Sequence, residues 1–243
     1  RTHNHARKGR ALGLGVMGWH TFLQQKNLPF NSIASTVHTR NIFNKIRMEA
    51  ETASMDLAAE YGEPIWCRGT GMRNTHLLAV APTVSNSVIC GGISAGIEPL
   101  PANVYTFNGA KGTFIRKNKV LEALLESKGE NKQKWWKQML EENGSVLGLP
   151  DTVLSAEEKD IFLTFSETNQ LELVKQAAER QKYIDQTQSL NLCFDPNDSP
   201  KWINQVHMEG WKLGIKTFYY LRTDSVIKGD LGSRQADCVS CDG

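Results

Sequence analysis

Two neighbouring tyrosines and a pair of cysteines are the residues of this chain best suited to redox chemistry. Tyr219 and Tyr220 end an apolar run of β type, and Cys238 and Cys241 form a Cys-x-x-Cys pair at the end of the sequence. Each feature alone has an ordinary interpretation, because adjacent tyrosines occur in simple strands and Cys-x-x-Cys pairs occur in metal sites. A phenol pair followed by a mobile dithiol is the combination that radical reduction chemistry needs, so together they predict a redox function.

The Cys-x-x-Cys pair is predicted to be a disulfide shuttle rather than a metal site. Residues 222–243 are rich in Gly, Asp and Ser with few apolar anchors, so we expect a disordered tail that lets the dithiol travel. A structural zinc needs four ligands, and the sequence holds no second Cys-x-x-Cys and no His-x-x-x-His pair. No metal is therefore expected, and Cys67 and Cys90 are interpreted as inert small residues.

A second candidate site is a short polar loop that follows a buried strand. Residues 77–81 form a continuous apolar run, which predicts a strand buried on both faces of a parallel sheet. Ligands of such sheets bind beyond the carboxyl ends of strands, where backbone N–H groups and hydroxyls can hold a diphosphate without any lysine. Taken alone, the pattern fits an ordinary strand-to-helix turn better. The loop comprises Pro82, Thr83, Val84, Ser85, Asn86 and Ser87.

A long helix precedes this strand in the predicted order of elements. Asn31 or Ser32 caps it, and Gly62 with Pro64 ends it. Apolar residues at helical spacing are expected to form its buried stripe. They are Ile33, Val37, Ile42, Ile46, Ala50, Ala53 and Leu57.

The rest of the chain predicts one α/β unit followed by the tail. A hairpin is predicted for residues 103–116, and a polar helical excursion for residues 119–182. A helix that Ser199 and Pro200 begin and Gly214 ends then joins two strands, which should run parallel. The two strands comprise residues 189–194 and 215–221.

A glycine motif near the N-terminus matches the dinucleotide fingerprint G-x-G-x-x-G. It spans Gly13 to Gly18, but no strand signal precedes it and no acidic residue follows about twenty positions on to bind a ribose. We therefore interpret these glycines as helix packing residues.

Composition excludes several classes of partner. The 243 residues carry a net charge of +2, with basic and acidic side chains interspersed, so no nucleic-acid or membrane-surface binding is indicated. No apolar run is long enough for a membrane span. The five scattered cysteines predict reduced thiols, which makes the cytoplasm the expected location.

Three separated segments resemble the large, catalytic subunit of aerobic (class I) ribonucleotide reductases. Residues 81–87 with 96–99 are similar to that family's substrate-phosphate loop and the segment after it. Residues 184–191 are similar to a late segment of its catalytic barrel, and residues 210–220 to its tyrosine-pair strand. The ending resembles its shuttle tail, and the resemblance runs over nearly the whole chain in the family's order.

The resemblance implies the C-terminal portion of a ten-stranded α/β barrel in residues 1–221, with helical excursions, and a flexible redox tail in residues 222–243. It implies reduction of ribonucleoside diphosphates to 2′-deoxyribonucleoside diphosphates, in which the loop from Pro82 to Ser87 positions the diphosphate. Tyr219 and Tyr220 would pass the oxidising equivalent, although consecutive strand residues point to opposite faces. We therefore expect an irregular strand there, or one phenol that reaches around the strand's edge, in a run that buries both.

The same resemblance implies partners and assigns the tail its role. Cys238 and Cys241 would re-reduce the active-site disulfide with electrons from thioredoxin or glutaredoxin. No cofactor is expected on this chain, because the family's di-iron centre and tyrosyl radical belong to the small subunit and its ATP and dNTP effectors to the N-terminal portion of the large subunit.

One further cysteine lies in a sequence that is superficially similar to the family's radical-cysteine finger, Asn-x-Cys-x-Glu. Asn191 to Asp195 ends in Asp and follows the late barrel segment, so we interpret Cys193 as a strand residue. The chain then lacks the thiyl cysteine and is expected to be inactive without the N-terminal portion, as one piece of a split subunit or of a longer chain. Arg1 in place of Met favours a preceding segment, and the tail favours a true C-terminus. The rival hypothesis is a non-catalytic scaffold or interaction module whose C-terminal Cys-x-x-Cys pair binds a metal or undergoes redox reactions.

Overall fold

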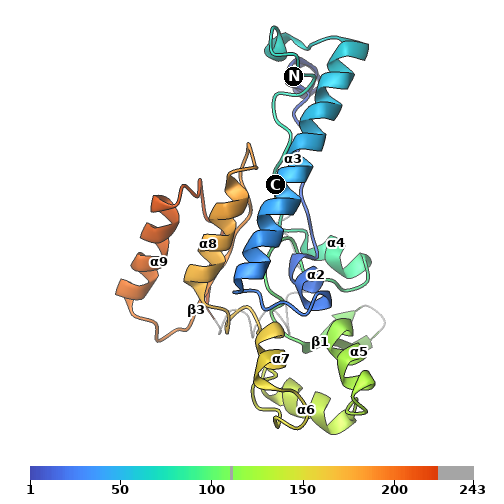
Figure 1. Cartoon of the computed structure of the whole chain (residues 1–243), viewed down its shortest axis with the longest axis vertical. Coiled ribbons are helices and arrows are strands. Elements are labelled where there is room, and N and C mark those ends of the chain that lie inside the picture. Colours follow the sequence, from blue (N-terminus) through green and yellow to red (C-terminus); the bar gives the residue numbers. More distant parts are fainter. Residues whose placement is uncertain (110–111, 224–243) are drawn as a thin grey trace.

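The computed structural model describes residues 1–109 and 112–223, and in Figure 1 the long helix α3 runs from the narrow end that holds the N-terminus into a broader body. The helices and strands, in chain order, are α1 (Thr2–Gly9), α2 (Trp19–Gln25), α3 (Ile33–Tyr61), η1 (Ile65–Cys67), α4 (Val84–Ile89), β1 (Val104–Gly109), β2 (Gly112–Lys117), α5 (Lys119–Ser127), α6 (Gln133–Glu141), α7 (Ala156–Ile161), α8 (Gln170–Gln181), β3 (Leu192–Phe194), α9 (Pro200–Lys212) and β4 (Leu221–Thr223).

Parallel extended segments form the centre of the body. The predicted strand at residues 77–81 is confirmed as a buried extended segment, which pairs in parallel on one side through Leu14 with Leu78 and on the other through Val80 with Gln188. The bonds from Leu14 N–H to the Leu77 carbonyl (2.8 Å) and from Val80 N–H to the Thr187 carbonyl (3.1 Å) hold it from both sides. A central segment bonded on both sides must be apolar on both faces, which explains its continuous hydrophobic run.

Asp185 fixes where the central segment begins. Its two carboxylate oxygens accept the N–H groups of Leu77 (2.7 Å) and Leu78 (2.9 Å), and Arg47 of α3 lies 3.3 Å from one of them. Hydrogen bonds to an ionised carboxylate are among the stronger ones in proteins. The contact therefore ties the loop that follows α8 to the first residues of the buried segment.

The predicted strand-helix-strand unit is confirmed. Ser199 caps α9 by accepting the Trp202 N–H, Pro200 is its first residue, and Gly214 (φ 83°) follows its end. β3 and β4 then pair in parallel, with Leu192 opposite Leu221. Both strands are shorter than predicted, because β3 begins at residue 192 instead of 189 and β4 begins at residue 221 instead of 215.

α3 forms where the sequence predicts it, but only part of the predicted apolar stripe packs against the core. Ser32 caps it by accepting the Ser35 N–H, and Gly62 ends it at φ 76°. Three members of the predicted apolar stripe, Ile42, Ile46 and Ala50, do pack against the main core. The stripe is wrong at its ends, because Ile33 is 85% exposed and Val37 and Leu57 are also exposed. The buried face instead carries small hydroxyl and apolar side chains whose hydroxyls bond within the protein, so the helix can lie close to α8. That face comprises Ser35, Thr39, Phe43, Ser54 and Ala58.

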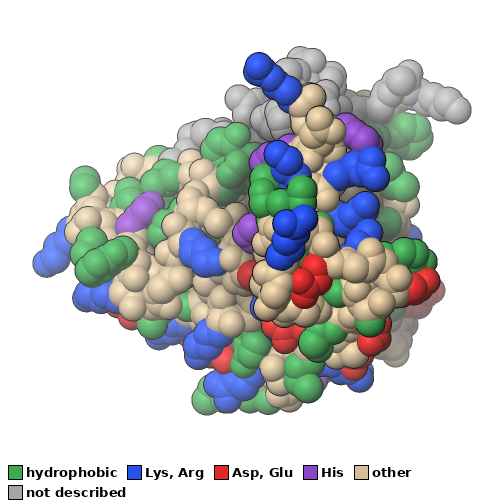
Figure 2. All heavy atoms as spheres, turned by 90° about the horizontal axis from the view of Figure 1, so that it is seen from above, with side chains coloured by type: hydrophobic (Ala, Val, Ile, Leu, Met, Phe, Trp, Pro, Cys, Tyr) green, Lys and Arg blue, Asp and Glu red, His purple; other side chains and the backbone are tan. Residues whose placement is uncertain are grey.

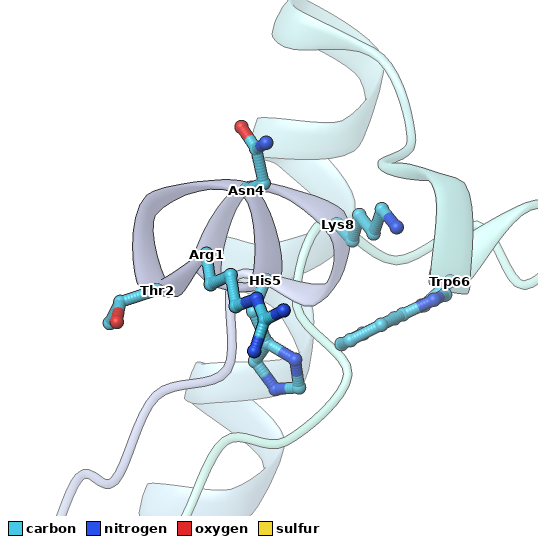
Figure 3. A pocket seen from close by; sticks show the side chains of 6 residues that line it. All are labelled: Arg1, Thr2, Asn4, His5, Lys8 and Trp66. Atoms are coloured by element: carbon cyan, nitrogen blue, oxygen red, sulfur yellow. The ribbon is translucent and has the colours of Figure 1, made fainter.

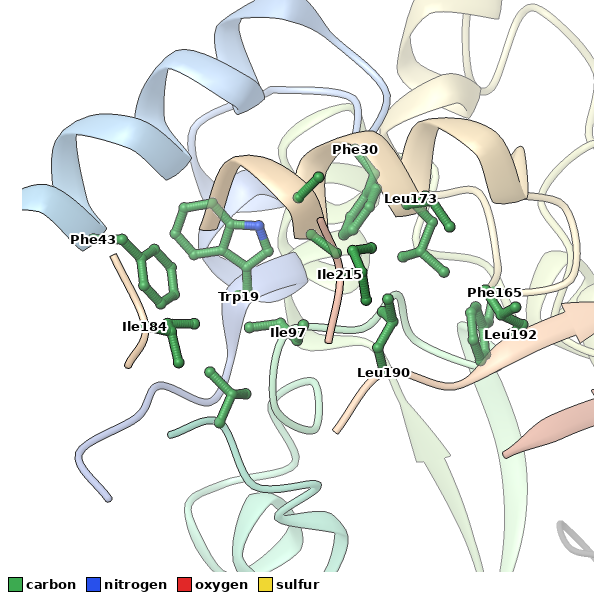
Figure 4. Packing of buried hydrophobic residues seen from close by; sticks show 14 of the residues in the cluster. Trp19, Phe30, Phe43, Ile97, Phe165, Leu173, Ile184, Leu190, Leu192 and Ile215 are labelled. Carbon is green, nitrogen blue, oxygen red and sulfur yellow. The ribbon is translucent and has the colours of Figure 1, made fainter. Parts of the chain in front are cut away.

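The main hydrophobic core lies between α3, α8 and the parallel segments. Figure 4 shows Trp19, Phe43 and Ile184 facing one another on one side and Leu190, Leu192 and Phe165 on the other. Fully burying a side chain of this size contributes about 1.5–3 kcal/mol. This core therefore holds α2, α3 and α8 against the strands. None of the described helices has both the length and the apolar character that a membrane span requires.

The helical excursion is confirmed, but it is shorter than predicted. α5, α6 and α7 pack with the antiparallel hairpin β1–β2 around a second core that includes Leu121, Trp136 and Phe162. α8 was expected to belong to the excursion, yet its Leu173, Val174 and Ala177 lie in the main core. A helix with those buried apolar residues gains more by packing on the barrel segments than by staying with a small helical lobe.

A seam of buried polar side chains joins the two cores. His20 Nδ1 accepts the Leu100 N–H (2.9 Å), which leaves its Nε2 to donate to the Ile161 carbonyl (3.3 Å). Burial lowers the pKa of His20 to about 4, so the ring stays neutral at pH 7. Asn118 extends the seam with a hydrogen bond to Gln24 at 3.1 Å.

The interpretation of the glycine motif as helix packing is wrong. Residues 11–17 are extended rather than helical, and they lie along the central segment. At Gly15 an added Cβ would lie 2.2 Å from the Ala79 carbonyl oxygen, so a side chain cannot fit there. Gly18, at φ 78°, turns the chain into α2. Close backbone approach therefore accounts for these glycines.

We predict that Gly15→Ala destabilises the chain by about 2 kcal/mol or more, because the backbone pairing at Ala79 must open to admit the methyl group. Gly13→Ala is the matched control, since its Cβ would make an ordinary 3.4 Å contact with the Ala79 side chain. Urea unfolding of the two variants measures the difference. Equal free energies of unfolding would contradict the packing explanation.

Candidate functional site

Tyr219 and Tyr220 lie in the extended segment before β4, with their rings together. The ring centroids are 4.1 Å apart at an interplanar angle of 52°. The expectation that the run buries them is wrong for this chain, because they are 42% and 44% exposed. They directly precede β4, at the edge of the main core, where solvent reaches their rings.

The two rings meet because the strand pairing contains one extra residue. Tyr219 N–H donates to the Leu190 carbonyl (2.8 Å), and the Tyr220 carbonyl accepts the Leu192 N–H (2.9 Å). In a regular parallel pair one residue makes both bonds, so here Tyr219 and Tyr220 together lie opposite Asn191, as in a β-bulge. The expected irregular strand is confirmed, and it removes the objection that neighbouring side chains must point apart.

A side chain accepts the backbone N–H that the bulge displaces. Asn191 Oδ1 accepts the Tyr220 N–H at 3.1 Å. Its Nδ2 donates to Glu98 Oε2 at 3.1 Å, and its backbone N–H donates to Glu98 Oε1 at 2.6 Å. Glu98 retains some solvent contact, but desolvation raises the pKa of its carboxyl against the opposing effects of Asn191, Arg222 and Arg180.

The predicted substrate loop surrounds the start of α4. Thr83 adopts a left-handed backbone (φ 50°, ψ 30°), which is strained for a β-branched residue, and its Oγ1 accepts the Gly96 N–H at 2.9 Å. Ser87 is buried and its hydroxyl donates to the Val84 carbonyl (2.7 Å). Ser85 is exposed at the surface of the loop. The remaining loop residues are Pro82, which is partly buried, and Asn86, which is exposed.

One short segment connects the loop with the tyrosines. Gly96 donates to Thr83, and two residues later Glu98 accepts both bonds from Asn191, which holds Tyr220. The fold therefore places the loop beside Gly96 and the tyrosine pair near Glu98, at the two ends of residues 96–98. Sequence reasoning included Glu98 and Asn191 only as part of similar segments. No local pattern marked them, because their contact joins residues that are far apart in the chain.

The cysteines divide into described and undescribed ones. Cys193 lies in β3 with its backbone N–H bonded to Gln170, which confirms it as a buried strand residue. Cys67 is buried, which raises the pKa of its thiol, and Cys90 is exposed. Cys238 and Cys241 lie outside the described residues. Within residues 1–109 and 112–223, no three His, Cys, Asp or Glu side chains come together as a metal site.

Arg180 is a buried cation that sequence reasoning missed. Its Nη1 donates to Gln176 (2.8 Å) and its Nε to Gln188 (3.2 Å). Burial lowers its pKa to about 9 against the attraction of Glu98. Its Nη2 is the one buried side-chain nitrogen or oxygen of the described residues that has no hydrogen-bond partner. Its neighbours in the sequence, Glu179 and Gln181, are polar, so the residue resembled an ordinary surface position of a helix and gave no signal for a buried charge.

A pocket at the N-terminal end is a poor candidate for the same chemistry. Figure 3 shows His5 facing Trp66, with ring centroids 4.7 Å apart, while Thr2 and Asn4 point outward. Figure 2 looks down on this end and shows Lys, Arg and His side chains mixed with acidic and apolar ones. In Figure 1 the N-terminal end lies well away from β3, and no residue that lines the pocket belongs to the tyrosine pair or to the loop from Pro82 to Ser87. Its full lining comprises Arg1, Thr2, Asn4, His5, Lys8 and Trp66.

Comparison with known proteins identifies the family. The model of the ribonucleotide reductase barrel domain matches residues 1–66 and 67–221. The ribonucleoside-diphosphate reductase large subunit of Invertebrate iridescent virus 6 is 40% identical over 95% of this chain and 24% of its own length. The large subunit of Danio rerio is 31% identical over 90% of this chain and 31% of its own length.

A solved structure agrees with this match. The Actinobacillus ureae class Id ribonucleotide reductase alpha subunit superposes with a TM-score of 0.84 and 40% identity, over 92% of this chain and 41% of that one. The chain thus spans between about a quarter and two fifths of the length of these relatives. Its parallel segments and helices are part of an α/β barrel, and the chain belongs to the ribonucleotide reductase family, within the barrel domain of the large subunit.

Proposed function

We propose that the chain is a component of a ribonucleoside-diphosphate reductase large subunit, which replaces the ribose 2′-hydroxyl of its substrate by hydrogen through a radical mechanism. The observation that carries the proposal is the pair of tyrosine rings, 4.1 Å apart in a bulge of a barrel strand, in a member of this family. Both rings are also partly exposed, at 42% and 44%. Their exposure suits residues that must meet a partner.

Radical transfer is the role proposed for Tyr219 and Tyr220. An oxidising equivalent leaves the tyrosyl radical of the small subunit, each phenol in turn gives up one electron and one proton, and a cysteine of the N-terminal portion becomes the thiyl radical. Each acceptor is reduced as the next donor is oxidised, so the pathway is redox neutral. Because the two rings are in contact, the electron crosses only a short distance between Tyr219 and Tyr220.

The loop from Pro82 to Ser87 is proposed to hold the substrate diphosphate. Ser87 donates its hydroxyl to the Val84 carbonyl, whereas the Thr83 oxygen only accepts the Gly96 N–H. The Thr83 O–H, the exposed Ser85 and Asn86 side chains and the backbone N–H groups of the first turn of α4 are therefore available to phosphate oxygens. The strained backbone at Thr83 supports this role, because strain concentrates at ligand sites. Val84 is also exposed and contributes its N–H rather than its side chain.

The reduction itself consumes two thiols. Substrate and two cysteine thiols give deoxynucleotide, water and one disulfide, and Cys238 with Cys241 then reduce that disulfide by thiol–disulfide exchange. Thioredoxin or glutaredoxin restores the tail dithiol. The thiyl cysteine, the two reducing cysteines and the ATP and dNTP effector sites are proposed to lie on the N-terminal portion, and the di-iron centre on the small subunit.

An open edge of the barrel segments supports a need for that N-terminal portion. Among the described residues, no further strand pairs with the outer side of residues 12–14. Open edges of this kind normally need another segment to cover them. We place residues 1–221 in the barrel and residues 222–243 in a redox tail, within a cytoplasmic enzyme of deoxynucleotide synthesis.

Removing either phenolic hydroxyl should abolish turnover without unfolding the chain. Tyr219→Phe and Tyr220→Phe should each cost about 1 kcal/mol of stability at most, because one hydrogen bond is at stake. Turnover of the assembled enzyme should fall at least about a thousandfold, since a phenyl ring cannot be oxidised under these conditions. The assay is dNDP formation with the N-terminal portion, the small subunit and dithiothreitol.

Tyr61→Phe is the matched control, because Tyr61 is an exposed tyrosine at the far end of α3. It should leave turnover unchanged. Near-normal turnover of the Tyr219 or Tyr220 variant would return that residue to a packing role.

Loss of the tail dithiol should block regeneration but not radical transfer. Cys238→Ser or Cys241→Ser should give low activity with thioredoxin or glutaredoxin, because a protein donor is too large to enter a buried site. Dithiothreitol is small enough to do so and should restore most of the activity. Cys90→Ser, which removes an exposed thiol outside the tail, should behave as wild type with both reductants. Equal loss with both reductants in the tail variants, or stoichiometric zinc in the wild-type chain, would argue against the shuttle.

A further inference from the structure

The Asn191 carboxamide is bonded at both ends, so its orientation is fixed. Oδ1 accepts the Tyr220 N–H (3.1 Å), and Nδ2 donates to Glu98 Oε2 (3.1 Å). A flipped carboxamide would set its NH₂ group against the Tyr220 N–H and its oxygen against the carboxylate, and both contacts would be repulsive. Glu98 therefore selects the orientation in which Asn191 can bind the tyrosine backbone.

Glu98 is itself held in place. Its Oε1 accepts the Asn191 backbone N–H at 2.6 Å, so both carboxylate oxygens bind the same residue. Desolvation raises the pKa of its carboxyl, while the hydrogen bonds from Asn191 and the positive charges of Arg222 and Arg180 act in the opposite direction. Because each of the two oxygens accepts an N–H group of Asn191, the carboxyl group is a fixed acceptor in this partly buried place.

The bulge makes this contact necessary. The extra residue moves the Tyr220 N–H away from the Leu190 carbonyl, which Tyr219 occupies. Without the Asn191 oxygen the strand would gain by returning to regular pairing, and the two rings would then point to opposite faces.

We propose that Glu98 and Asn191 are positioning residues for the radical step, since they hold the bulge that keeps the Tyr219 and Tyr220 rings together. This inference rests on the proposed function of the tyrosines. It assigns no redox chemistry to Glu98 or Asn191 themselves, because a carboxylate and a carboxamide act here only as hydrogen-bonding groups.

A reciprocal exchange of the two side chains tests the proposal. Glu98→Gln keeps an oxygen for the Asn191 N–H but sets an NH₂ group against Nδ2. Asn191→Asp keeps an acceptor for the Tyr220 N–H but sets a carboxylate against Glu98. In the double variant the introduced amide donates to the introduced carboxylate, so the bond is restored with reversed polarity while the acceptor for Tyr220 remains.

Each single variant should lower kcat at least about tenfold, with KM for the nucleoside diphosphate within about twofold of wild type. The double variant should recover kcat to within about threefold. Turnover is measured with dithiothreitol and expressed per assembled complex. Hydrogen exchange of the Tyr220 backbone amide should accelerate in both single variants and slow again in the double variant. This measurement uses the chain alone, so it also decides the test when a variant binds the other subunits weakly.

Asp185→Asn is the matched control, because Asp185 also accepts two backbone N–H groups but contacts neither tyrosine. It should lower stability while leaving kcat per complex within about twofold. The proposal is overturned if both single variants keep full kcat, or if the double variant has no higher kcat than either single variant. It is also overturned if Asp185→Asn lowers kcat as much as they do. If Tyr220→Phe also retained turnover, the proposed function would fail; if only the Glu98 and Asn191 variants were active, this inference alone would fail.

Discussion

One extra residue in a strand pairing is the constraint on which the candidate redox site depends. Because Tyr219 and Tyr220 share the place opposite Asn191, their rings lie 4.1 Å apart instead of on opposite faces. The displaced N–H must find an acceptor, and Asn191 supplies it with Glu98 behind it. A local defect in the ladder thus becomes a defined arrangement of two phenols.

The surrounding fold holds this defect in register. The strand that pairs with the tyrosine segment continues from residues 186–189, which bond through their backbone to the buried segment at residues 77–80. The loop that begins at Pro82 leaves the same buried segment at its carboxyl end. The main core beneath α3 and α8 therefore positions both candidate sites, and the segment from Gly96 to Glu98 connects them.

Sequence reasoning succeeded where the signal was local. The cap at Ser32, the hairpin and the parallel pair around α9 are set by residues close in sequence, and all were predicted. It failed at the buried face of α3 and at Gly15, because small residues are chosen there by a neighbour far along the chain. The Glu98–Asn191 contact depends on a distant partner in the same way, whereas an irregular strand at the two adjacent tyrosines was expected from the sequence. The identity of the family came from segments similar to a known subunit, and not from periodicity.

The measurement that tests the central claim most directly is reconstitution of reductase activity from separate parts. Purified chain is combined with the small subunit and dithiothreitol, with and without the N-terminal portion of the large subunit, and dNDP formation from a ribonucleoside diphosphate is followed. The account predicts no product without the N-terminal portion and sustained turnover with it. Product from the chain and small subunit alone, or none from the complete mixture when all parts have bound, would contradict it.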